Sequence, residues 1–142
     1  MSRGFTLIEL IIVIALAVII FSFTVGVGSD FYLSQSLIAE RDSVVSLLRR
    51  ARIKAMNNTR QSNQGLFIAA GEYVIFEGDT YAGRSVDFDE VFPRAGRVQI
   101  SGPSEIVFNS SEGSSSASGT ISIVSGAGTA KILVNSEGRI SW

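Results

Sequence analysis

The chain has 142 residues, with 12 basic and 13 acidic side chains, and its net charge is −1. It contains no cysteine, which excludes disulfide bonds and thiol chemistry. It contains no histidine, which removes the usual proton acceptor near neutral pH and the commonest metal ligand. These counts argue against an enzyme, and we expect neither a cofactor nor a metal ion.

A short leader, residues 1–4, precedes a long apolar segment, residues 5–28. Glu9 is the only charged residue in that segment. As a helix the segment spans about 35 Å, slightly more than the roughly 30 Å hydrocarbon core of a bilayer. We therefore expect one transmembrane helix. Arg3 would keep the N-terminus in the cytoplasm, so that the rest of the chain is exported from the inner membrane.

An ordinary cleaved signal peptide is the alternative for this segment, with residues 25–28 as a weak cleavage site. The apolar core of such a peptide is usually about 7–15 residues long, and this one is longer. A signal peptide also has no use for a carboxylate at Glu9. The mature N-terminus distinguishes the two interpretations, because it lies at Phe5 in one and near Ser29 in the other.

The stretch RGFTLIELIIVIALAVII, residues 3–20, resembles the class III signal of type IV pilins and type II secretion pseudopilins. The resemblance implies that a prepilin peptidase cuts after Gly4 and methylates the new N-terminal residue, Phe5. It also implies that Glu9 is the carboxylate used in filament assembly. The implied partners are the peptidase, other pilin or pseudopilin subunits, the inner-membrane assembly platform and membrane lipid.

The carboxylate of Glu9 would cost roughly 2.5–3.5 kcal/mol in the middle of a bilayer. In a bundle of such helices, the α-ammonium group of a neighbouring subunit can pair with it and recover much of that cost. Glu9 would then make a single subunit less stable in lipid and would favour one axial stagger between neighbouring subunits. The alternative is that Glu9 only reaches back to the nearby interface.

Residues 29–58 are predicted to form an amphipathic helix that ends near Asn57-Asn58. Its apolar stripe recurs at helical spacing and consists of Leu37, Val44, Leu48, Ala51 and Ala55. Between the two helical segments, Gly26 and Gly28 together cost about 2 kcal/mol relative to alanine. We expect a continuous helix in the isolated subunit, with a hinge at these two glycines.

Basic side chains gather near the predicted helix end, at Arg49, Arg50, Arg52, Lys54 and Arg60. Ordinary solvation and favourable placement near a helix C-terminus explain such a cluster. The alternatives are a contact of residues 49–54 with acidic surfaces of neighbouring subunits, and a contact with DNA.

The hydrophobic period changes from 3.6 to 2 after Gln64, so residues 59–142 are predicted to form a β domain. A hairpin is expected in residues 65–78, with its turn near Ala70-Gly71. Composition predicts a flexible surface loop at residues 110–119. The further predicted strands are 97–101 and 105–109 around Gly102-Pro103, 120–124 and 130–134 around residues 125–128, and a short last strand at 139–142.

Six or seven short strands favour two antiparallel sheets packed on the helix stripe, an α+β fold. This layout resembles the domain of GspH/FimT-like pseudopilins over essentially the whole chain, with LLRRARIKAMNNTRQ at the helix end and AKILVNSEGRISW at the C-terminus. Members of that family are minor subunits of a type II secretion pseudopilus or a type IV pilus. The resemblance therefore implies a structural subunit rather than an enzyme.

Two binding sites have weaker support in the sequence. Asp87, Asp89 and Glu90 could offer oxygen ligands to Ca²⁺, but strand alternation would place the two aspartates on one solvent face. A DNA-binding minor pilin of a competence system is the alternative function. Some FimT-like pilins bind DNA through a C-terminal Gly-Arg-x-Arg, and residues 138–141 here, Gly-Arg-Ile-Ser, lack the second arginine. Nucleic acid is therefore not an expected partner.

Overall fold

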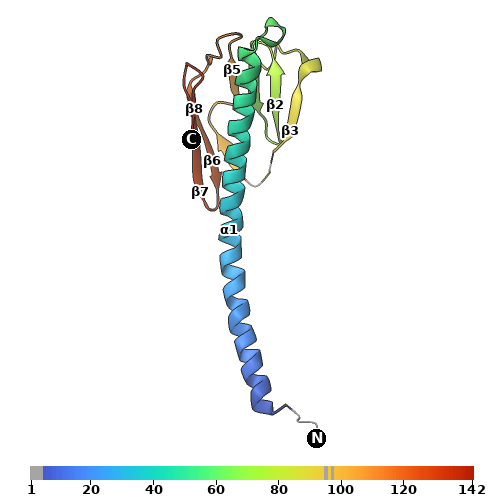
Figure 1. Cartoon of the computed structure of the whole chain (residues 1–142), viewed down its shortest axis with the longest axis vertical. Coiled ribbons are helices and arrows are strands. Elements are labelled where there is room, and N and C mark those ends of the chain that lie inside the picture. Colours follow the sequence, from blue (N-terminus) through green and yellow to red (C-terminus); the bar gives the residue numbers. More distant parts are fainter. Residues whose placement is uncertain (1–4, 95, 97) are drawn as a thin grey trace.

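The computed structural model describes residues 5–94, 96 and 98–142, with the backbone alone for residues 23–31. One long helix, α1 (Leu7–Met56), precedes two four-stranded antiparallel sheets. Figure 1 shows both sheets beside the C-terminal half of the helix, while the N-terminal half extends away from them. The fold is α+β, as the sequence predicts.

The strands are short, and two 3₁₀ turns, η1 (Thr59–Gln61) and η2 (Val86–Phe88), lie between elements. The first sheet has the order β3-β2-β1-β5 and the second has the order β4-β6-β7-β8. The strand bounds are β1 (Gln64–Ile68), β2 (Glu72–Glu77), β3 (Glu90–Pro93), β4 (Gln99–Ser101), β5 (Glu105–Phe108), β6 (Gly119–Ser125), β7 (Gly128–Val134) and β8 (Ile140–Ser141).

Helix α1 ends at the predicted place. The backbone N–H of Asn57 donates to the carbonyl of Ile53 at 2.9 Å and closes the last turn. Asn58 then adopts a left-handed conformation with φ 51°, which a right-handed helix cannot continue. At 1.5 Å per residue, the 50-residue helix is about 75 Å long.

The apolar stripe of α1 packs on both sheets at once. Val44, Leu48, Ala51 and Ala55 are fully buried, and Leu37 packs partly against the same core. Their buried partners are Leu66, Ile75, Ile106 and Phe108 from the first sheet, and Ile121, Ile123, Ile132 and Val134 from the second. Because these side chains pack together, one continuous core joins the helix to both sheets. Each large side chain buried in this way contributes about 1.5–3 kcal/mol of transfer free energy.

The first sheet is covered on its outer face as well. The loop between β2 and β3 places Tyr81 on that face, with its ring stacked on Phe67 at a centroid distance of 3.8 Å. Gly65 lies opposite Phe76 in the β1–β2 register and leaves room for the Phe76 ring. A second small core on this face consists of Val74, Phe76 and Val107.

The predicted hairpins at residues 65–78 and 120–134 form as β1–β2 and β6–β7, and β8 pairs with β7 as the last strand. The two strands that flank Gly102-Pro103 do not pair with each other, because β4 joins the second sheet and β5 joins the first. The chain therefore crosses between the sheets at this turn. Hydrophobic alternation marks the strands but carries no information about their partners.

The acidic segment near residue 89 does not form the solvent face that alternation predicts. Residues Val86–Phe88 form the 3₁₀ turn η2, so Asp87 and Asp89 do not alternate along a strand. Asp89 pairs with Arg84 at 2.8 Å, and its side chain is only 11% exposed. Glu90 begins β3 and turns toward the helix. The ion pair between Arg84 and Asp89 fixes the conformation of this segment, and a period-2 hydrophobic pattern carries no information about such a pair.

The predicted surface loop at residues 110–119 is tied to the rest of the domain. Ser115 is buried, bridges to Phe108 and donates its backbone N–H to the carbonyl of Ser136 at 2.9 Å. The guanidinium group of Arg52 donates to the carbonyl of Gly113 at 3.1 Å. The loop therefore connects the helix end to the turn before β8.

Candidate functional site

The candidate site begins at the N-terminus of α1, where Thr6 and Glu9 form a reciprocal cap. The backbone N–H and the hydroxyl of Thr6 each donate to Oε2 of Glu9 at 2.9 Å. The backbone N–H of Glu9 donates to Oγ1 of Thr6 at 3.3 Å. This arrangement is a capping box, in which each residue satisfies a donor that the first helical turn leaves without a partner.

This cap is a role of Thr6 and Glu9 that the sequence interpretation missed, although the pattern Thr-x-x-Glu before an apolar run is its recognised signal. Glu9 therefore holds the first turn of its own helix in the single subunit. The carboxylate also lies next to a helix N-terminus, where the helix dipole favours negative charge. Phe5, immediately before the cap, is 84% exposed.

The first turns of α1 expose apolar side chains on every side. From Phe5 to Phe21 the large apolar side chains are 52–84% exposed, and the β domain contacts none of them in the described part of the chain. A helix that is apolar all round requires burial in an apolar environment. This part of α1 therefore remains to be covered by lipid or by other helices.

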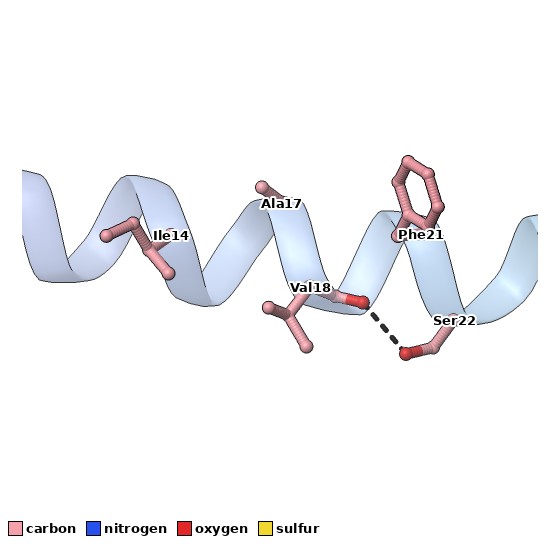
Figure 2. Close-up of a pocket in the computed structure, with 5 residues that line it drawn as sticks. All are labelled: Ile14, Ala17, Val18, Phe21 and Ser22. Atoms are coloured by element: carbon pink, nitrogen blue, oxygen red, sulfur yellow. Dashed lines mark hydrogen bonds between the residues drawn. The ribbon is translucent and has the colours of Figure 1, made fainter.

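One hollow lies on this apolar surface, with a volume of about 550 Å³. Figure 2 shows Ala17 on the helix between the larger side chains of Ile14 and Phe21, and the hydroxyl of Ser22 donating to the carbonyl of Val18 at 2.8 Å. The hollow arises because alanine is smaller than its neighbours. The polar hydroxyl is satisfied within the helix, so the surface around it stays apolar.

The structure describes the other predicted residues of this segment, Gly4, Gly26 and Gly28, to different extents. Gly4 lies outside the described residues. The backbone is helical through Gly26 and Gly28, in agreement with the continuous helix expected for an isolated subunit, and their hinge role stays a prediction. Within the fully described part of the chain, no helix combines the length and the apolar character that crossing a membrane requires.

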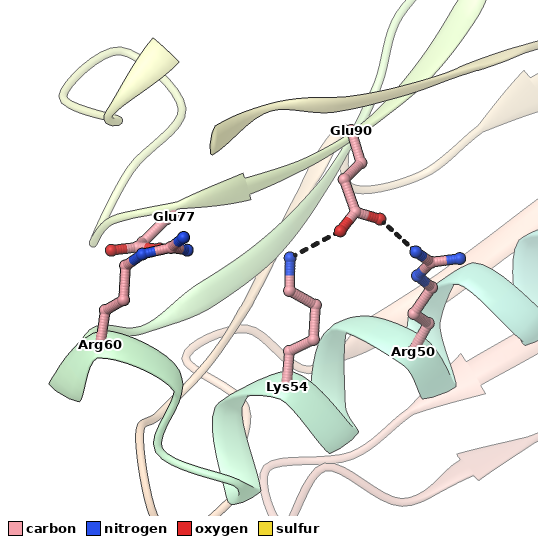
Figure 3. A network of polar contacts seen from close by, with 5 residues as sticks. All are labelled: Arg50, Lys54, Arg60, Glu77 and Glu90. Atoms are coloured by element: carbon pink, nitrogen blue, oxygen red, sulfur yellow. Dashed lines mark hydrogen bonds and ion pairs between the residues drawn. The ribbon is translucent and has the colours of Figure 1, made fainter. Parts of the chain in front are cut away.

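The basic residues near the helix end connect α1 to the first sheet. The carboxylate of Glu90 in β3 forms ion pairs with Arg50 at 2.7 Å and with Lys54 at 3.0 Å, and Figure 3 shows both pairs. Arg60 pairs with the nearly buried Glu77 at 3.2 Å and lies over the ring of Phe88. The two Glu90 pairs thus hold β3 against α1, and the Arg60–Glu77 pair holds the turn after α1 against β2.

The remaining two members of the predicted cluster have no carboxylate partner among the described residues. Arg49 lies over the ring of Trp142 at 4.2 Å from the ring centroid. Arg52 donates to two backbone carbonyls, those of Gly113 and Glu137. All four basic residues from 49 to 54 thus contact other parts of their own chain, and their contact with neighbouring subunits stays a prediction.

A buried polar pair also joins α1 to the first sheet. The hydroxyl of Tyr73 in β2 donates to Oε1 of Glu40 in α1, and both residues are almost fully buried. Burial raises the pKa of Tyr73 far above its ordinary value, and the hydrogen bond to Glu40 and the negative charge of Glu40 raise it further. The tyrosine therefore stays protonated and holds the carboxylate in place.

Comparison with known proteins bears on the N-terminal segment alone. Neither a curated protein nor a solved structure matches the chain. Residues 1–25 match the family model of the prokaryotic N-terminal methylation motif, a stretch that contains Gly4, Phe5 and the Thr6–Glu9 cap. The motif indicates a type IV pilin-like or pseudopilin precursor that prepilin peptidase processes and that assembles with other pilin subunits.

Proposed function

We propose that this chain is a minor, non-enzymatic subunit of a type II secretion pseudopilus or a type IV pilus, of the GspH/FimT-like kind. The methylation motif at residues 1–25 is the observation that carries the proposal. Prepilin peptidase cuts after Gly4 and methylates Phe5. The mature subunit then waits in the inner membrane until the assembly platform adds it to a filament.

The distribution of apolar surface supports this proposal. The C-terminal half of α1 is buried by the β domain, whereas its first turns are exposed on all sides. One continuous helix can therefore carry a folded domain at one end and leave the other end free for lipid or for a helical bundle. Residues 5–28 are the segment that we assign to the membrane and to the filament core.

Glu9 supports the filament part of the proposal. Its carboxylate accepts two hydrogen bonds from Thr6, and one oxygen, Oε2, receives both of them. An ionised carboxylate can accept about four hydrogen bonds, so Glu9 retains acceptor capacity for a cation from outside the subunit. The methylated α-amino group of a neighbouring Phe5 is the cation that we assign to it.

Processing at Gly4 tests the proposal. A side chain at the cut would obstruct the close approach of the peptidase to the backbone. We expect Gly4→Val to accumulate as the longer precursor, and the wild-type chain to begin with methylated Phe5 when its mature N-terminus is measured by mass spectrometry. Leu7→Val, three residues beyond the cut, is the matched control and should be processed normally. A mature N-terminus near Ser29 would instead identify an ordinary signal peptide and overturn the proposal.

A further inference from the structure

The turn of the β6–β7 hairpin lies against α1 close to the level at which the segment assigned to the membrane ends. A β-carbon at Gly126 would lie 3.2 Å from Cδ1 of Leu33, so the turn touches the helix at this residue. Gly28 ends the assigned segment, and Leu33 follows it by five residues, which is about 7.5 Å along the helix axis. The turn therefore lies within about 7.5 Å of the end of that segment.

The hairpin is also the part of the β domain that reaches down the helix. Among the strands that Figure 1 labels, those of this hairpin extend furthest toward the N-terminal half of α1. Glu72 begins β2 and Arg94 follows β3, so these two charged residues lie at the end of the first sheet, further from that half of the helix. A bilayer around the N-terminal half would thus meet the hairpin before the first sheet.

Charged residues are sparse in the parts of the chain at this level. Residues 119–130, which contain the whole turn, have no charged side chain, and Asp30 is the only charged residue in the sequence from 10 to 39. Val124 is 40% exposed beside the turn, and Tyr32 is 56% exposed on α1. Tyrosine is enriched at membrane–water interfaces, so this composition suits contact with the headgroup region of a bilayer.

The headgroup region is thick enough to reach the turn. The hydrocarbon core is about 30 Å thick and the whole bilayer is about 40–45 Å thick, which leaves about 5–7 Å for the headgroups on each side. As a helix, residues 5–28 span about 35 Å and cross the core completely. The turn, which lies just beyond their end, is then at the level of the lipid headgroups.

We propose that residues 124–129, the β6–β7 turn with its flanking residues, form a second membrane contact that rests among the lipid headgroups while the subunit is stored in the membrane. This inference rests on the proposed function, because it takes residues 5–28 as the membrane segment. A single helix would leave the β domain free to rotate about the helix axis. A second contact away from that axis fixes which face of the domain is turned from the membrane.

Quenching by lipid-borne nitroxides tests the contact in the full-length chain, which contains no cysteine of its own. Ala127→Cys carries a bimane fluorophore in vesicles of phosphatidylcholine and phosphatidylglycerol, and we expect nitroxides on the lipid headgroups to quench it. Ala70→Cys, at an exposed alanine of the β1–β2 turn, is the matched control and should be quenched much less. Equal quenching at the two positions would overturn the contact.

A charge in the turn tests whether lipid is the partner. The side chain of Ala127 is exposed, so the hairpin should tolerate a longer residue there. With bimane at Thr129→Cys, Ala127→Glu should lower the population of the contact about fivefold in the anionic vesicles, because one charge near an anionic membrane is worth about this factor. Ala127→Gln has nearly the same shape and should keep the contact. Equal quenching in the two variants would contradict a lipid contact.

Two further measurements separate failure of this contact from failure of the proposed function. Bimane at Phe21→Cys, within the assigned membrane segment, should be quenched by nitroxides on the acyl chains. That result without quenching at residue 127 would overturn the turn contact and leave the membrane-stored subunit standing, whereas absence of quenching at both positions would overturn both. Protection of Ala127→Cys from a water-soluble maleimide in sheared filaments, but not in membranes, would overturn the lipid contact and assign the turn to a neighbouring subunit.

Discussion

Glu9 shows how one side chain can serve two structures at different stages. In the single subunit it caps the first turn of α1 through Thr6, and this local role needs hydrogen-bond acceptors rather than a charge. In the proposed filament it pairs with a cation from a neighbour, and this role needs the charge. The motif Thr-x-x-Glu therefore supports helix capping and filament assembly with the same four residues.

Replacement of Glu9 can separate these two roles. Glu9→Leu removes the cap and the charge, and makes the lone subunit more stable in lipid by about 2.5–3.5 kcal/mol. Glu9→Gln keeps a side chain that completes a capping box but removes the charge. We expect both variants to be processed and both to be strongly reduced in sheared filaments. Normal assembly of Glu9→Gln beside failure of Glu9→Leu would identify the cap, rather than the charge pair, as the requirement.

The buried Tyr73–Glu40 pair predicts the behaviour of the domain at high pH. Tyr73→Phe removes the donor to a buried carboxylate and should lower the free energy of unfolding by about 1–3 kcal/mol. Because burial and Glu40 raise the pKa of Tyr73, the folded domain keeps this proton at a pH where the unfolded chain has lost it. The stability is thus fully present below about pH 10, the unfolded value, and falls as the pH rises above it.

Urea unfolding between pH 8 and pH 11 measures both effects. The wild-type chain should lose stability above about pH 10, and Tyr73→Phe should lose less over the same interval. Ile75→Val, a change at a fully buried position of the same strand that removes no titratable group, is the matched control and should lower the stability without changing its pH dependence. An unchanged pH dependence in Tyr73→Phe would contradict the contribution of the buried hydroxyl.

At the scale of elements, α1 combines two environments in one continuous helix. Residues 37–55 pack into the domain core, and residues 5–21 carry no contact with it. Gly26 and Gly28 lie between these parts, where the backbone is helical. Glycine lowers helix stability without changing the hydrogen-bond pattern, so a helix can be continuous in one state and bend in another.

The double change Gly26→Ala, Gly28→Ala tests this hinge. It should stabilise the helix by about 2 kcal/mol, raise the helicity measured by circular dichroism and reduce incorporation into filaments. Ala15→Gly, Ala17→Gly is an informative counterpart, because it should lower helicity without moving the hinge. Filaments of the double alanine variant that form as well as wild type would indicate instead that the glycines serve close helix packing.

The sheets show where local pattern stops being informative. The hairpins β1–β2 and β6–β7 join neighbouring strands through short turns, and alternation predicts both of them. The turn at Gly102-Pro103 looks the same in sequence, yet β4 and β5 belong to different sheets. Only the competition among strands for partners in the folded domain decides between a hairpin and a crossing.

At the scale of the whole molecule, the core predicts a domain that is independent of the apolar segment. Among the residues whose side chains the structure describes, every fully buried apolar one lies at or after Val44, and the first described turns of α1 add nothing to that core. A shortened chain of residues 30–142 should therefore unfold in one cooperative transition. Its free energy of unfolding should lie within about 0.5 kcal/mol of that of the full chain in detergent.

Calorimetry of the two chains checks this expectation. The Leu48→Ala variant of residues 30–142, which opens a cavity at a fully buried position, should lose about 2–5 kcal/mol and provides the reference for a damaged core. A loss of that size on removal of residues 1–29 would show that the apolar segment supports the domain after all.

Sequence alone determined the elements whose cause is local. The end of α1 at Asn57-Asn58, the buried stripe and two hairpins depend on neighbours a few residues apart, so their pattern is visible in one dimension. The Thr6–Glu9 cap has the same local cause, although the sequence interpretation missed it. The methylation motif belongs to the same group, because the peptidase acts on a contiguous stretch.

Only the tertiary structure decided the features that need residues distant in sequence. Glu90 meets Arg50 and Lys54 only because β3 folds back along the helix. Arg49 meets Trp142, and Arg139 lines one hollow with Arg49 and Arg52, only because β8 returns to the end of α1. Such contacts depend on which strands pair and which sheet each strand enters, and that choice minimises the free energy of the whole core rather than of any single segment.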